Sequence, residues 1–135
     1  MVTGILNNPT TSIQEKLGQL VENYIDLLKQ NPNIPLFVLG EINNNPSDFL
    51  QKIDVKEKVL ASHFFQQFHQ EIIAKGGVPF NPLHLIMNFA SLIIFPFMGS
   101  PIVKEIASLD DVAFNQLMDE RKTLIIRWFE AMMKI

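Results

Sequence analysis

The sequence contains no cysteine and comparatively few charged residues. Without cysteine, the chain has no disulfides, no thiolate nucleophile and no cysteine-ligated zinc or iron–sulfur site. Charged residues make up 19% of the 135 residues, whereas about 25% is typical of soluble domains. Eleven Lys and Arg against 14 Asp and Glu give a formal net charge of −3. The chain therefore offers no basic surface for phosphates and is a poor candidate for binding nucleic acid by itself.

Motifs of catalysis and metal binding are also missing. The sequence has no HExxH, no glycine-rich phosphate loop and no GxSxG, the short patterns that carry much of known enzyme chemistry. His63 and His69 are six residues apart and would lie on different sides of a helix. The carboxylate pairs Asp110–Asp111 and Asp119–Glu120 are explained by helix capping and solvation. We therefore predict no enzyme activity, no catalytic residue, no metal and no cofactor.

A long uncharged segment raises the question of a membrane span. The 28 residues between Lys75 and Lys104 carry no charge, but their longest proline-free stretch is Leu83–Phe95, 13 residues. A transmembrane helix needs about 20, so we expect a helix that is buried within protein and no membrane partner. The first residues, Met1 to Pro9, have neither the basic start nor the apolar run of a signal peptide, which indicates a cytoplasmic protein.

Capping and periodicity signals predict helices throughout the chain. Ser12 and Glu15 form a capping box that opens a helix ending at Asn31. The other expected helices cover Leu36–Ile42, Ser47–Ile53, a segment opened by Asp54 and Glu57 and ended by Lys75, Leu83–Phe95, Ile102–Ala107, and a final helix from Asp110 to Lys134. No segment alternates with the period of a strand. The chain is therefore predicted to be all-α, with one domain of about seven helices over residues 11–135 and an N-terminal tail over residues 1–10.

The final helix has an unusually wide apolar face. Nine of its side chains fall on an arc of roughly 160°, namely Ala113, Phe114, Leu117, Met118, Leu124, Ile125, Trp128, Phe129 and Met132. One partner helix rarely covers so much, so we expect this helix and Leu83–Phe95 to form a four-helix bundle with a second subunit. The candidate interface residues are Phe89, Ile93, Leu117, Arg121, Leu124 and Trp128. The alternative is a single, unusually apolar monomeric core.

Several polar residues interrupt the apolar faces. Arg121 lies near the middle of the arc and cannot lose its proton, so we expect an acidic partner, either Glu71 or Glu41. Their contact is either a structural ion pair, across helices or across the dimer, or a ligand-sensing charge.

An uncharged polar stripe lies on the expected helix Leu83–Phe95. His84, Asn88 and Ser91 are spaced i, i+4 and i+7, which suits either a pocket wall or a buried interface. The ring of Tyr24 is expected in the core, with its hydroxyl reaching a partner or a cavity. The candidate ligand-binding residues are Tyr24, Glu41, Phe64, Phe68, His84, Asn88 and Ser91, although Phe64 and Phe68 also fit an ordinary core.

Two stretches carry a family resemblance. They are Asn31–Pro46, which reads NPNIPLFVLGEINNNP, and Asn81–Asn88, which reads NPLHLIMN and leads into Ile94–Phe97 (IFPF) and Pro101. Together they resemble the C-terminal regulatory domain of TetR-family transcriptional repressors, over nearly the whole chain. The resemblance implies an all-helical domain with a pocket for a small, often hydrophobic effector and a dimer bundle built from Leu83–Phe95 and Asp111–Lys134.

The sequence departs from that family at its start. Family members begin with a helix-turn-helix domain, and nothing before Thr11 supplies its helices or its basic recognition residues. The chain is thus expected to be either an excised fragment or a natural protein without its DNA reader, so that DNA is a partner only through an absent N-terminal domain. The leading hypothesis is an effector-binding, homodimerising regulatory domain. The alternative is a stand-alone helical homodimer that carries a small hydrophobic ligand or serves as a scaffold.

Overall fold

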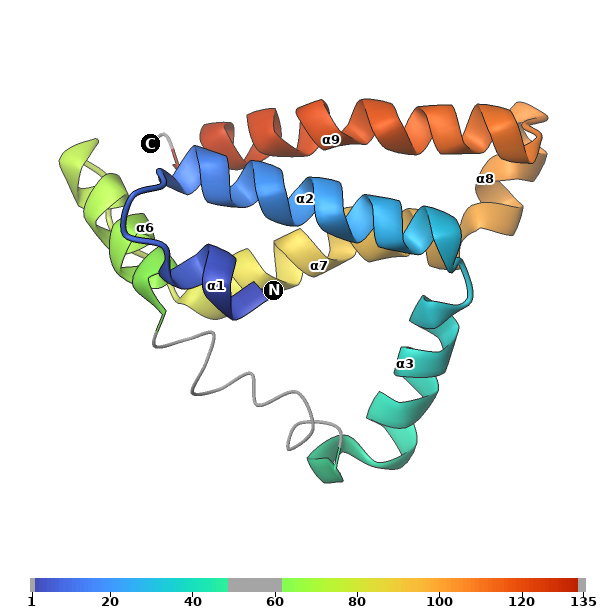
Figure 1. The fold of residues 1–135 in the computed structure, drawn as a ribbon, viewed down its shortest axis with the longest axis horizontal. Helices are drawn as coiled ribbons and strands as arrows, with labels where there is room; N and C mark the ends of the chain where they lie inside the picture. The colour runs from blue at the N-terminus through green and yellow to red at the C-terminus, as the bar shows by residue number, and fades with distance from the viewer. Residues whose placement is uncertain (1, 49–61, 134–135) are drawn as a thin grey trace.

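The computed structural model describes residues 2–48 and 62–133, and every element within these ranges is a helix (Figure 1). The predicted all-α class is confirmed. The helices are α1 (Val2–Asn7), α2 (Ile13–Gln30), α3 (Ile34–Asn44), α6 (His63–Ala74), α7 (Pro82–Met98), α8 (Ser100–Ala107) and α9 (Asp111–Met133). The predicted helix Ser47–Ile53 and the Asp54–Glu57 capping box extend into residues 49–61, outside the described residues.

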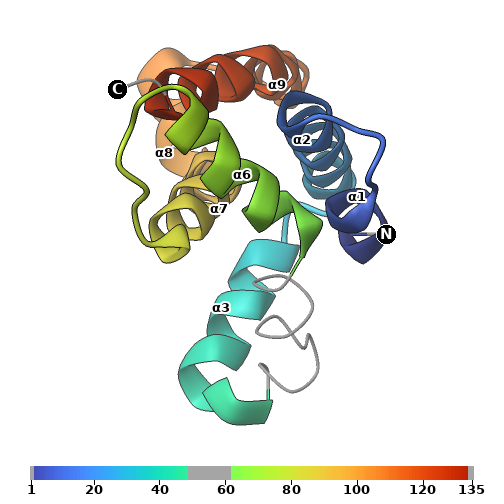
Figure 2. The ribbon, with the colours of Figure 1, turned by 90° about the vertical axis from the view of Figure 1, so that its left-hand side faces the viewer.

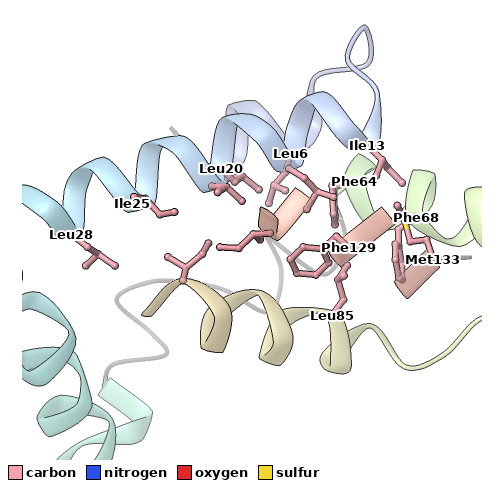
Figure 3. Packing of buried hydrophobic residues seen from close by; sticks show 14 of the residues in the cluster. Leu6, Ile13, Leu20, Ile25, Leu28, Phe64, Phe68, Leu85, Phe129 and Met133 are labelled. Atoms are coloured by element: carbon pink, nitrogen blue, oxygen red, sulfur yellow. The ribbon is translucent and has the colours of Figure 1, made fainter. Parts of the chain in front are cut away.

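The core lies between α2, α7 and α9. Helix α9 packs along α2 and runs back in the opposite direction, and α7 contacts both α2 and α9 across the core (Figures 1 and 2). Helix α6 crosses one end of this bundle and contacts α1 and α2, whereas α3 projects from the other end and contacts α7. Ile25, Ile125 and Phe129 are almost completely buried at the centre, and Figure 3 shows Ile25 and Phe129 within the apolar cluster.

Three predicted helix starts are confirmed by their capping bonds. The Ser12 hydroxyl accepts a hydrogen bond from the Glu15 N–H at 3.1 Å. The Asp110 carboxylate accepts one from the Ala113 N–H at 2.8 Å and opens α9. Helix α7 is capped by the Asn81 side chain, which accepts from the Leu83 N–H at 3.0 Å. These caps depend on residues two or three positions apart, which is why the sequence pattern is sufficient to place them.

The N-terminal residues differ from the predicted tail. Val2–Asn7 form α1, and Leu6 is buried against α2 and α6. The turn after α1 is held by Lys16, whose ammonium group donates to the carbonyl oxygens of Asn8 at 2.6 Å and Thr11 at 2.8 Å, and to the Thr11 hydroxyl at 2.7 Å. All three N–H donors of this fully buried lysine are satisfied by neutral oxygens. Desolvation lowers the pKa of Lys16.

Helix α7 also runs further than predicted. The sequence pattern ends the helix at Phe95 because proline lacks an N–H and its ring crowds the preceding turn. In the structure α7 continues through the buried Pro96 to Met98. Helix α8 then follows at an angle of 64°. Among the described residues no single helix is long and apolar enough to cross a membrane, although α7 and α8 reach that length and hydropathy together as a bent pair.

Candidate functional site

A groove of about 490 Å³ lies between α7, α8 and α9. Ligand pockets commonly have volumes of about 300–1,000 Å³. The residues that line this groove come from all three helices: Ser91, Leu92, Phe95, Pro96, Val103, Leu117, Met118, Glu120, Arg121 and Leu124. The groove exists because α8 bends away from α7 while α9 returns along α2. Its wall is mostly apolar, with a single cationic side chain.

That cation, Arg121, is held in place by two contacts. Its Nη2 donates to the Leu92 carbonyl oxygen at 2.7 Å. Its guanidinium carbon lies 5.2 Å from the centre of the Trp128 ring, within the range of a cation–π contact. Burial lowers the pKa of Arg121, but a guanidinium stays charged in proteins.

The Leu92 carbonyl oxygen can accept a hydrogen bond from another helix because of Pro96. In an α-helix the N–H of residue 96 would donate to the oxygen of residue 92, and proline has no N–H to donate. Arg121 supplies the missing donor from α9. This contact explains how α7 continues through Pro96 without leaving that carbonyl unpaired in the groove wall.

An acidic partner of Arg121 from its own chain, as predicted between helices, is not found, and a partner across a dimer stays a prediction. Within the described ranges, no carboxylate lies within ion-pair distance of its guanidinium, and its buried Nε has no acceptor. Glu71 instead pairs with Lys75 one turn later on α6, at 3.3 Å. Glu41 lies on α3, which projects away from α9 (Figures 1 and 2). The sequence argument sought a charge to balance a charge, whereas the actual partner is a backbone oxygen.

The predicted interface residues fall into two groups. Leu117, Arg121 and Leu124 line the groove, and the Trp128 side chain, next to Arg121, is 41% exposed. The second group, Phe89 and Ile93, packs into the core of the chain itself.

Two predicted interface residues on α7 face inward. Ile93 is buried, so a partner could not reach it. Phe89 is half-buried, with its ring centre 6.5 Å from that of Tyr24 and 5.7 Å from that of Phe129. Ile93 is thus part of the core of the chain itself, whereas Phe89 keeps some exposed surface, and the dimer interface stays a prediction.

The predicted ligand-binding residues are not brought together. Phe64 and Phe68 are buried in the core, stacked with ring centres 6.4 Å apart. Tyr24 is half-buried against Phe89, and burial raises its pKa. Glu41 is half-buried on α3. None of these four lines the groove.

The polar stripe on α7 lies at the surface. His84 is exposed beside the Phe80 ring, 6.5 Å between centres. The Asn88 amide donates to the Met132 sulfur at 3.4 Å, and the Ser91 hydroxyl donates to the Asn88 carbonyl at 3.1 Å. Of the stripe only Ser91 reaches the groove.

A second, much smaller cavity of about 60 Å³ lies between α6 and the start of α7, where Phe68, Phe80 and Pro82 form part of its wall. It has room for little more than a few waters. The larger groove is therefore the candidate site.

The sequence argument missed most of this groove. Leu92, Phe95, Pro96, Val103, Met118 and Glu120 line it, and no spacing along the sequence relates the α7 residues among them to those of α8 and α9. The sequence offered two signals of the groove: the uncharged run around Pro96 and an arginine within an apolar arc. Only the angles between the helices bring these two segments together.

No family model, curated protein or solved structure matches this chain. The TetR resemblance therefore stays a prediction. Within the described part of the chain, no cluster of three or more His, Cys, Asp or Glu side chains could hold a metal ion.

Proposed function

We propose that this chain is the effector-binding and homodimerisation domain of a TetR-like transcriptional regulator. The observation that carries the proposal is the groove between α7, α8 and α9, which is large enough for a small molecule and is lined by exposed α9 side chains. A ligand that binds there would shift the equilibrium between positions of these helices. In a dimer, that shift would change the spacing of two helix-turn-helix domains joined to the bundle.

Helix α9 carries both buried and exposed apolar side chains, which supports dimerisation. Phe114, Met118 and Phe129 are buried, whereas the neighbouring Leu117 and Trp128 stay 37% and 41% exposed. The apolar arc of α9 is thus wider than the part covered by α2. A twofold axis close to α9 would bring this exposed strip against the same strip of a second copy, as isologous dimers require.

The alternative function is a stand-alone helical homodimer that carries a small hydrophobic ligand. The same groove and the same exposed strip favour it, and neither depends on DNA. A helix-turn-helix coding sequence joined to this one in the parent gene would favour the regulator, and its absence there would favour the carrier.

Native mass spectrometry tests the dimer. We expect a species of twice 15.4 kDa. Leu117→Glu should convert it to the monomer, because a buried unpaired carboxylate in the interface is costly. Val78→Glu is the matched control, since Val78 is 79% exposed in the connection between α6 and α7. A monomer at all concentrations, or equal dimer fractions in both variants, would contradict the proposal.

A further inference from the structure

The guanidinium of Arg121 lacks a counter-charge in the described structure. One of its five N–H groups donates to the Leu92 carbonyl, and the others have no acceptor among the described residues. The one other charged residue in the groove wall is Glu120, the exposed neighbour of Arg121, and it makes no ion pair with it. A half-buried cation of this kind favours an anion that can reach it.

The position of this cation is fixed before any ligand arrives. The Leu92 carbonyl holds Nη2, and the guanidinium carbon lies over the Trp128 ring, 5.2 Å from its centre. Arg121 cannot swing out to solvent without leaving that carbonyl unpaired, because Pro96 provides no alternative donor. A ligand therefore meets a donor that is already oriented, which reduces the entropy cost of binding.

The rest of the groove is suited to an apolar chain. Leu92, Phe95, Val103, Leu117 and Leu124 contribute its walls, around a volume of about 490 Å³.

A neutral hydrophobic molecule would fill this space but leave the cation without a counter-charge. A dianion such as a phosphate monoester would bring a second negative charge close to Glu120, where like charges repel.

We propose that the groove binds an amphipathic monocarboxylate, with its carboxylate on Arg121 and its apolar chain between α7, α8 and α9. This proposal deepens the ligand-binding part of the proposed function and rests on it. It does not depend on the dimer, because all the lining residues belong to one chain.

The chain contains its own probe of this site. Trp128 is the only tryptophan of the sequence, and its ring lies against the guanidinium that would receive the carboxylate. We would titrate the whole chain at neutral pH with decanoate and, separately, with decan-1-ol, and follow tryptophan fluorescence. Decanoate should bind at least about tenfold more tightly, which corresponds to one charge-assisted hydrogen bond. Equal affinities of the two ligands would overturn the proposal, and this comparison requires no variant.

Two arginine variants locate the charge. Arg121→Met should abolish the preference for decanoate over decan-1-ol. Arg127→Met removes the same charge from an exposed position of the same helix and should have no effect. Glu120→Gln should strengthen decanoate binding severalfold. Circular dichroism verifies that each variant is folded, and if Arg121→Met is not, Arg121→Lys should keep a preference for decanoate. Equal losses in Arg121→Met and Arg127→Met would overturn the assignment.

Native mass spectra with decanoate separate this proposal from dimerisation. Decanoate bound to a 15.4 kDa species would support the ligand site and contradict the dimer. A dimer that does not distinguish decanoate from decan-1-ol would support the dimer and overturn the ligand site.

Discussion

The contact between Arg121 and the Leu92 carbonyl can be tested by a double-mutant cycle with Pro96. In the unmodified chain, Arg121→Met removes a charged hydrogen bond and leaves the Leu92 oxygen without its donor. Such bonds contribute about 1.5–3 kcal/mol net, and the contact with Trp128 adds about 0.5–1 kcal/mol. Methionine keeps much of the apolar stem. The free energy of unfolding should therefore fall by about 2–4 kcal/mol.

Pro96→Ala changes that expectation. An alanine at this position has an N–H that can donate to the Leu92 oxygen one turn earlier. In the Pro96→Ala background, Arg121→Met should then cost only about 0.5–1 kcal/mol, mainly the lost contact with the Trp128 ring. The effect of Pro96→Ala on the unfolded chain appears in both arms and cancels. The predicted coupling energy is about 1.5–3 kcal/mol, the contribution of the hydrogen bond alone.

Urea unfolding of the four proteins, followed by far-UV circular dichroism, measures the coupling. Arg127→Met in both backgrounds provides the control, with no coupling expected because Arg127 is exposed. Independent sites add to within about 0.5 kcal/mol. Additive effects of Arg121→Met and Pro96→Ala within that margin would refute the conclusion that Arg121 replaces the donor that Pro96 lacks.

Three further predictions concern stability. Lys16→Met should lower the free energy of unfolding by about 2–4 kcal/mol, because three part-buried oxygens lose a charged donor. Lys29→Met, which breaks a surface pair with Asp119, should cost under about 1 kcal/mol. Equal losses on urea unfolding would contradict this. The hydrogen bond from Lys29 lowers the pKa of Asp119 below 3.8, so this pair stabilises the fold above pH 3.8 and its contribution is lost as the pH falls through the lowered value. Acid titrations should show this loss of stability in the wild type. The loss should be smaller in Asp119→Asn, and the difference should be under about 1 kcal/mol because the pair is exposed. Gly76 has a φ of +80° at the end of α6, so Gly76→Ala should lower the melting temperature through about 1 kcal/mol of backbone strain, and an unchanged melting temperature would be inconsistent with that conformation.

The fold could be predicted where its determinants are local. Ser12 and Asp110 cap helices through bonds to residues three positions away, and such pairs can be recognised in the sequence. Helix α1 has only six residues, too few for a periodic pattern, and its burial depends on a contact with α6 some 56 positions later, where the His63 N–H donates to the Asn7 side chain. The sequence pattern therefore predicted a tail where the structure has a helix.

The candidate site was predicted less well for the same reason. Arg121 was recognised as a charge that needs a partner, but that partner is the Leu92 oxygen, 29 positions away, which only Pro96 makes available. The groove depends on the angle between α7 and α8, and no residue spacing encodes this angle. The expected pocket residues Phe64 and Phe68 follow the ordinary rule that aromatic side chains on a helical face belong to the core.

The attachment of α1 has a mechanical consequence. Lys16 binds the turn after α1 through the backbone oxygens of Asn8 and Thr11, and Gln67 of α6 donates to the same Thr11 oxygen at 2.9 Å. The start of α2, the turn and α6 are thus joined into one hydrogen-bonded unit, and most of the acceptors are backbone atoms that side-chain substitution leaves in place. Any domain fused ahead of Val2 would be connected directly to this unit and not through a flexible linker. A rotation of α2 or α6 would then be transmitted to that domain as a change of orientation.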